Sequence, residues 1–272
     1  FKSETRMEIN TYATGLFAAL LYCGVAVLQF VSLRRGQIYN KYVLIFGFLA
    51  VALHFLDIIF SILERSGPLF NVTETSSIIA ATISSVVLIS SLKKPLLNLL
   101  IIIFPFAMLS ILASLLSAEK DQASTVHPSI ASHILLSVLA YSIFSIAAIQ
   151  AIIVAYQNFQ LRNHRTEGIL QAFPSLQDME SLLFEILWVG QILLSLGIFA
   201  GFSFSENIWA LTGMIHKSFF SIVAWTIFTI LLWGRSRMGW RGYTAIKFTL
   251  TGFILLFLGF YGTKIAVEYF IS

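Results

Sequence analysis

Eight stretches of mostly apolar residues fill almost the whole of this chain. Each stretch is about 17 to 25 residues long, close to the length with which a helix crosses the hydrocarbon core of a bilayer. Backbone amide groups in hydrocarbon must find hydrogen-bond partners within their own segment, so apolar runs of this length are expected to be helices. The sequence therefore predicts an all-α fold, a polytopic integral membrane protein built as a bundle of eight transmembrane helices.

The apolar runs leave little room for a water-soluble domain. Of the residues, 58% are hydrophobic and 11% are charged, against about 25% charged residues in a soluble domain. The expected spans are 12–33, 42–63, 76–92, 95–117, 133–157, 181–202, 214–233 and 248–269. Met7 resembles a natural start, so residues 1–6 are interpreted as a non-native remnant and residues 7–272 as a single transmembrane domain.

The basic residues predict the orientation of the chain, because Lys and Arg near span ends favour the cytoplasmic side. One set of alternate loops holds eleven of the 17 Lys and Arg residues and the other holds six. The richer set is Arg34, Arg35, Lys41, Lys93, Lys94, Arg162, Arg165, Arg235, Arg237, Arg241 and Lys247. Both termini are then expected outside the cytoplasm, and the net charge of +4 indicates contact with membrane lipid rather than with nucleic acid.

Three histidines, His54, His133 and His216, lie within spans or at their outer ends. Ionisable groups in a membrane are costly and usually serve a function. His133, Ser137 and Tyr141 recur every four residues, so they form a polar stripe on one helix face that is expected to face the bundle. With His216 at the outer end of another span, this stripe makes a bis-histidine haem site conceivable, because haem iron accepts imidazoles from two separate helices.

His54 and Asp57 share a helix face, because they are three residues apart. The carboxylate could accept one imidazole N–H and leave the other ring nitrogen free for a metal. Alternatively, the two side chains have a structural role and hydrogen-bond to each other or to a neighbouring helix. Gln150 and Gln191 are further candidates for hydrogen bonds between helices. Gly197-x-x-x-Gly201 predicts close approach of another helix, more simply within the bundle than in a dimer.

Known catalytic motifs are missing from the sequence. Cys23 is the single cysteine, so there is no disulfide framework and no Cys-x-x-Cys-His haem-attachment motif. There is also no H-E-x-x-H, G-x-S-x-G or P-loop segment. Any haem is therefore expected to be b-type and non-covalent, and binding or delivery of haem is expected rather than turnover chemistry.

Several segments of the second half resemble the cytochrome c assembly (CcsA/CcmC-like) family, in particular its YpjD/HemX branch. The resemblance covers about residues 127–270, with weaker support from His54. The matching segments are His133-Ile-Leu-Leu-Ser-Val-Leu-Ala-Tyr141, Phe173-Pro174-Ser175-Leu176, Ser221-Ile-Val-Ala-Trp225, Leu232-Trp233-Gly234, Gly239-Trp-Arg-Gly242 and Gly259-Phe-Tyr-Gly262.

The resemblance implies an eight-helix protein of the bacterial inner membrane that handles haem at its outer face. The family places a haem-ligating histidine at the start of the fifth span, and this role carries over to His133. The chain lacks the family's tryptophan-rich W-G-x-x-W-x-W-D segment, which presents haem to the apocytochrome, and reads Ser205-Glu-Asn-Ile-Trp209 there. It also lacks the family's histidine after the last span. His54, with its acid partner, or else His216 is then expected to supply the second axial ligand.

The leading hypothesis is a haem-binding membrane protein for haem handling or respiratory-protein assembly. Its expected haem-binding residues are His133, His54, His216, Asp57, Ser137 and Tyr141, and its expected partners are lipid, haem and a cytochrome or another membrane protein. One alternative is a small-molecule transporter or exporter, although no internal repeat typical of transporters is found. The other is a scaffold or regulator that keeps the family fold without its chemistry.

Overall fold

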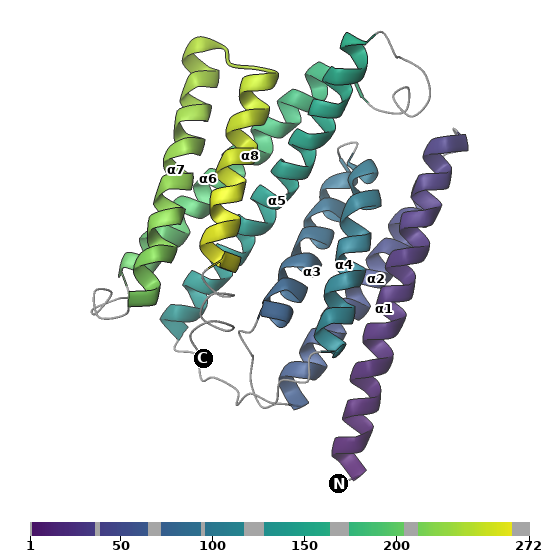
Figure 1. Ribbon diagram of the computed structural model, residues 1–272. Coiled ribbons are helices and arrows are strands. Elements are labelled where there is room, and N and C mark those ends of the chain that lie inside the picture. The colour runs from purple at the N-terminus through teal and green to yellow at the C-terminus, as the bar shows by residue number, and fades with distance from the viewer. Residues whose placement is uncertain are drawn as a thin grey trace. The chain divides into compact units, whose positions relative to one another are not determined.

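The computed structural model describes residues 2–35, 39–64, 72–93, 96–116, 128–163, 174–203 and 212–262, and within these ranges the side chains of 2–11, 64, 128–131 and 212–218 lie outside that description. The described residues form helices joined by short connections, with no strand among them (Figure 1). In this part of the chain, 8 helices are long and apolar enough to cross a membrane. The predicted all-α, eight-span fold is confirmed.

Each helix corresponds to one predicted span. The helices are α1 (Lys2–Arg35), α2 (Asn40–Glu64), α3 (Val72–Ser91), α4 (Leu100–Leu116), α5 (Pro128–Arg162), α6 (Leu176–Ser203), α7 (Thr212–Met238) and α8 (Tyr243–Phe257), with a 3-10 turn η1 (Leu97–Leu99) before α4 and a π-helical turn η4 (Leu258–Gly262) after α8. Of these, α1, α5, α6 and α8 begin five or more residues earlier than predicted. The predicted stretch 263–269 lies outside the described residues.

Several helices extend beyond the predicted apolar spans. Polar residues at the helix ends can continue the helical backbone hydrogen bonds, although they are not apolar enough to be part of a predicted span. At the end of α7, Arg235 and Arg237 occupy the last turn, where positive charge complements the helix dipole. At the start of α6, Ser175 acts as a cap. Its Oγ accepts the backbone N–H of Asp178 at 3.2 Å and donates to the Asp178 carboxylate at 2.6 Å. The Phe-Pro-Ser-Leu segment thus contains a helix start signal.

The helices form two compact units, α1–α4 and α5–α8. In the first unit, α1 and α3 each pack on α2 and α4. In the second, α5 and α7 each pack on α6 and α8, and Figure 1 shows the helices of each unit running alongside one another. Each unit is thus a ring of four helices with its own core. The single-domain interpretation of 7–272, the status of residues 1–6 and the orientation in the membrane stay predictions.

The core of the second unit is centred on two stacked rings. Phe144 of α5 and Phe228 of α7 lie with their ring centroids 4.0 Å apart, and both side chains are fully buried. A Cβ atom at Gly190 of α6 would lie 3.0 Å from the Phe144 ring, and one at Gly252 of α8 would lie 2.6 Å from the Phe228 ring. Glycine at these two positions therefore lets α6 and α8 pack directly against the stacked rings of α5 and α7.

The outer surface of the described helices is apolar. Large hydrophobic side chains such as Leu20, Phe106 and Phe199 are more than half exposed. A soluble protein seldom exposes large contiguous apolar patches. Such a surface suits lipid, in agreement with the predicted lipid contacts.

Candidate functional site

His133 lies near the start of α5 with one of its two ring nitrogens engaged. Nδ1 is 2.8 Å from the backbone carbonyl oxygen of Gly197 on α6. Since a carbonyl oxygen only accepts hydrogen bonds, the proton of the neutral ring is on Nδ1 and Nε2 carries a lone pair. Among the described residues, no group is hydrogen-bonded to Nε2. The structure thus presents a half-buried imidazole in the tautomer that binds a metal through Nε2.

Two glycines on α6 make room for this histidine. A Cβ atom at Gly201 would lie 3.0 Å from Cε1 and 3.1 Å from Nδ1 of His133, closer than side-chain atoms normally approach. At Gly197, the atom nearest to such a Cβ would be Oγ of Ser137 at 3.6 Å, an ordinary contact. The glycine pair therefore lets α5 pack closely against α6 within the second unit. The prediction of close helix packing within the bundle is confirmed.

The polar stripe of α5 faces two neighbouring helices. Ser137, one turn after His133, lies against α6. Tyr141, one turn further, contacts rings of α8 and η4, with its ring centroid 5.8 Å from that of Phe253 and 5.7 Å from that of Phe260. Its hydroxyl is buried, with no hydrogen-bond partner among the described residues. The stripe faces the interior of the second unit as predicted, but its three members do not share one neighbour.

His54 lies in the first unit and is fully buried. Its Nδ1 is 3.2 Å from the hydroxyl of Tyr22 on α1, and its Nε2 is 2.8 Å from the hydroxyl of Ser77 on α3. A neutral imidazole donates from one nitrogen and accepts at the other, so one hydroxyl accepts and the other donates. Both ring nitrogens are therefore already used in joining α2 to α1 and α3.

Asp57, one turn after His54 on α2, lies close to α1. A Cβ atom at Gly15 of α1 would lie 2.8 Å from Oδ1 of Asp57, and the Asp57 side chain is only 2% exposed. Sequence spacing left two roles open: this acid orients the imidazole, or the pair bonds internally or to a neighbouring helix. The described hydrogen bonds of His54 go to the hydroxyls of Tyr22 and Ser77 on neighbouring helices.

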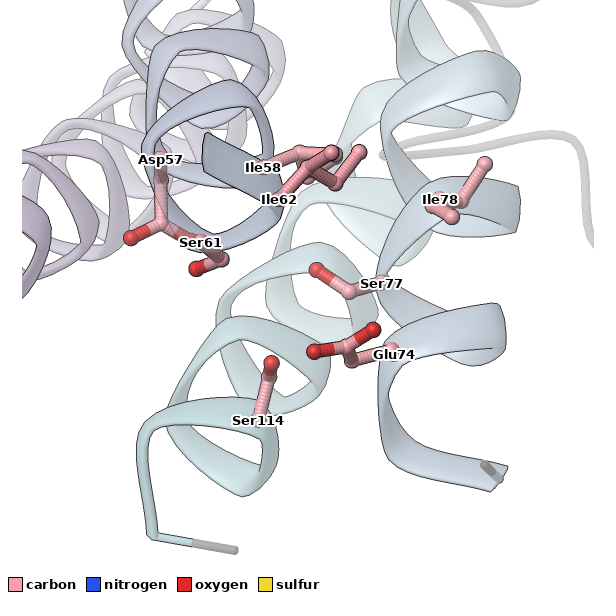
Figure 2. Close-up of a pocket in the computed structure, with 8 residues that line it drawn as sticks. All are labelled: Asp57, Ile58, Ser61, Ile62, Glu74, Ser77, Ile78 and Ser114. Carbon is pink, nitrogen blue, oxygen red and sulfur yellow. The ribbon is translucent and has the colours of Figure 1, made fainter. Parts of the chain in front are cut away.

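A small pocket lies between α2, α3 and α4, at the end of α2 that carries Asp57 (Figure 2). Its lining residues are Asp57, Ile58, Ser61, Ile62, Glu74, Ser77, Ile78 and Ser114. Its free space is about that of one water molecule, so it has no room for a porphyrin. Ser77 lines this pocket and is also hydrogen-bonded to the buried imidazole of His54.

The third histidine, His216, lies on α7 in the second unit. Its side chain is outside the described part of the structure, as is that of every α7 residue before Phe219. The structure therefore assigns His133 and His216 to one four-helix unit and His54 to the other. Among the described side chains, no three His, Cys, Asp or Glu groups gather to hold a metal ion.

Two glutamines predicted to join helices do so. Nε2 of Gln150 donates to a backbone carbonyl of α6 at 3.1 Å. Nε2 of Gln191 on α6 donates to Oγ1 of Thr229 on α7 at 2.7 Å. The indole N–H of Trp225, on α7, donates to Oγ of Ser195 at 2.8 Å. These bonds attach α5 and α7 to α6, the helix whose carbonyl holds His133.

The segment 239–242 between α7 and α8 forms a tight turn on the second unit. A Cβ atom at Gly234 would lie 2.4 Å from the Trp240 ring, so the indole packs directly on the α7 backbone. Gly242 has a positive φ of 54°, and its N–H donates to Oε1 of Glu180 on α6 at 3.0 Å. Sequence reasoning missed Glu180, although an acid at the start of a largely apolar helix was the available signal.

The fold and the comparisons with known proteins define a multi-pass inner-membrane protein. The chain belongs to the cytochrome c assembly protein family, which it matches over residues 39–271. Inner membrane protein YpjD of Escherichia coli (strain K12) is 30% identical over 204 residues, which are 75% of this chain and 77% of that protein. The resemblance inferred from the sequence motifs is confirmed, and family membership supports a role in cytochrome c biogenesis.

More distant relatives match shorter parts of the chain. An uncharacterized 28.8 kDa protein of Azospirillum brasilense is 25% identical over 137 residues, 50% of this chain and 51% of that protein. The cytochrome c biogenesis protein CcsA of Lolium perenne is 24% identical over 88 residues, 32% of this chain and 28% of that protein. No solved structure matches the chain.

Proposed function

We propose that the protein binds haem non-covalently in the inner membrane and handles it during cytochrome assembly, with His133 as an axial ligand. The observation that carries this proposal is the hydrogen bond from Nδ1 of His133 to the Gly197 carbonyl. Histidines that bind metals almost always donate their other ring N–H to a carbonyl, a carboxylate or a water molecule. His133 already has this arrangement, and its Nε2 is left for iron.

The second axial position is proposed for His216, with His54 as the alternative. His216 lies on α7 in the same unit as His133. His54 would have to give up its hydrogen bond with Tyr22 or Ser77 before either ring nitrogen could bind iron. Leaving a buried hydrogen-bonding group without its partner costs about 1–3 kcal/mol, so this exchange opposes ligation by His54.

The haem is proposed to be b-type. Covalent attachment needs cysteine thiols, and Cys23 is the single cysteine of the chain. When bound, haem would supply a redox-active iron. The residues of this chain would bind and orient it, with Ser137 and Tyr141 on the same face of α5 as His133. Asp57 remains a candidate contact only if His54 takes part.

The test is the absorption spectrum of the protein purified from haem-replete cells. A Soret band that is lost in His133→Ala and restored by added imidazole is the expected result, because free imidazole can occupy the vacated ligand position. His164→Ala is the matched control, since it removes a histidine from a charged connection and is expected to keep the band. A protein that stays colourless after haem is added would favour the scaffold or transporter alternatives.

A further inference from the structure

We propose that Gly201 is a positioning residue for His133: its missing side chain opens the Gly197 carbonyl to the imidazole and thereby fixes which ring nitrogen faces a ligand. The predicted effect on haem binding rests on the proposed function. The predicted position of the proton on the His133 ring does not depend on haem, so the two predictions can be tested separately.

The helix geometry explains why the second glycine matters more than the first. In an α-helix the N–H of residue i+4 points at the carbonyl oxygen of residue i. The side chain of residue 201 would therefore stand beside the carbonyl of residue 197. With glycine at 201, the ring of His133 reaches that oxygen at 2.8 Å. A carbonyl oxygen has two lone pairs, so it can accept this bond together with its helical one.

The two glycines differ in what they tolerate. A Cβ atom at Gly201 would lie 3.0 Å from Cε1 and 3.1 Å from Nδ1 of His133, so the ring would have to move by a few tenths of an ångström. A Cβ at Gly197 would meet Ser137 at 3.6 Å and nothing closer, and the carbonyl would stay in place. The geometry therefore assigns the positioning role to Gly201 and predicts that alanine is accepted at Gly197.

A third glycine of α6 provides a matched control. A Cβ atom at Gly190 would lie 3.0 Å from the ring of Phe144. Gly190→Ala therefore creates comparable crowding between the same two helices, α5 and α6, but against Phe144 and, at 3.2 Å, Ile143 rather than against a histidine. Any effect that Gly201→Ala has beyond that of Gly190→Ala is due to the histidine rather than to crowded packing.

The first measurement uses the haem-free protein. Nitrogen NMR of ¹⁵N-histidine-labelled protein in detergent reports which ring nitrogen carries the proton, and His133→Ala identifies the signal. The wild type, Gly197→Ala and Gly190→Ala are expected to show the proton on Nδ1, whereas Gly201→Ala is expected to show a mixture of both tautomers. A wild-type ring with its proton on Nε2 would overturn the proposal without any variant, as would a Gly201→Ala spectrum identical to that of the wild type.

The second measurement uses the haem-loaded protein. Loss of the supporting hydrogen bond to a ligating histidine weakens metal affinity about 10- to 100-fold. It also lowers the iron–histidine stretching frequency, which resonance Raman spectroscopy detects in the five-coordinate ferrous haem expected when His216→Ala is combined with each variant. Both changes are expected in Gly201→Ala and not in the control Gly190→Ala. If no variant binds haem while the tautomer result holds, the proposed function fails and the positioning role stands. If haem binds equally well to all variants, Gly201 does not position the ligand.

Discussion

The hydroxyl of Tyr22 lies 3.2 Å from Nδ1 of His54, and both side chains are fully buried in the first unit. Their rings also meet edge to face, with centroids 5.7 Å apart. The pair joins α1 to α2, and Ser77 extends the connection to α3. In hydrocarbon or a protein core, a hydrogen-bonding group that loses its partner finds no water to replace it. We therefore infer that His54 mainly holds the first unit together.

Tyr22→Phe is expected to destabilise the protein by about 1–3 kcal/mol, because it leaves Nδ1 of His54 buried without a partner. Tyr12→Phe is the matched control: it makes the same change on the same helix at a side chain that is 55% exposed. Its effect is expected to stay within about 0.5 kcal/mol. Unfolding of the purified variants in mixed detergent micelles gives both values, and equal stabilities would show that the buried bond contributes nothing.

The assignment of the second axial ligand predicts opposite results for two histidines. If His216 is the ligand, His216→Ala is expected to convert six-coordinate low-spin haem to the five-coordinate high-spin form. His54→Gln, which keeps a polar side chain in the first unit, is expected to leave the haem spectrum unchanged and to lower stability. Absorption and electron paramagnetic resonance spectra distinguish these cases. A change of spin state in His54→Gln alone would instead make His54 the ligand.

The spans could be predicted from the sequence because a bilayer imposes a length on every apolar helix. The same reasoning placed His133, Ser137 and Tyr141 on one inward face, since that depends only on spacing along a single helix. Which helix faces which residue does not follow from spacing. The partner of His133 is a backbone carbonyl 64 positions away, and no pattern of side chains marks it.

The hydrogen bonds of His54 show the same limit. Asp57 was one expected partner, because it is near in sequence, and a group on a neighbouring helix was the alternative. The ring nitrogens bind hydroxyls on neighbouring helices that are 32 and 23 positions away. Neighbours on one helix share a face without pointing at one another, and packing against other helices decides which groups meet. The glycine pair on α6 and the glutamines Gln150 and Gln191 were sequence signals of interhelical contacts that the structure confirms, because small residues let helices approach closely and polar side chains bond across them.

Gly234→Ala is expected to destabilise the second unit by about 1–3 kcal/mol, as overpacking typically does. The new methyl group would lie 2.4 Å from the rigid ring of Trp240, so the 239–242 turn would have to move. Gly24→Ala is the control, because a Cβ atom there meets nothing within 4 Å. That change is expected to be neutral or to stabilise α1 by about 0.5–1 kcal/mol, since alanine favours the helix. Thermal unfolding followed by circular dichroism compares the two.

Glu180 links the start of α6 to the start of α8 through its bond with the N–H of Gly242. Its side chain is 9% exposed, and the hydrogen bond to the Gly242 N–H is partly buried. Glu180→Ala is expected to cost about 1–3 kcal/mol of stability, whereas Glu180→Gln keeps an oxygen acceptor of the same reach and is expected to lose less. Amide hydrogen exchange at Gly242 gives the more direct measurement: it should accelerate in Glu180→Ala and stay slow in Glu180→Gln. Equal exchange in the two variants would mean that the turn is held without Glu180, by the packing of Trp240 on Gly234 and by the hydrogen bonds between the Trp240 backbone and α7.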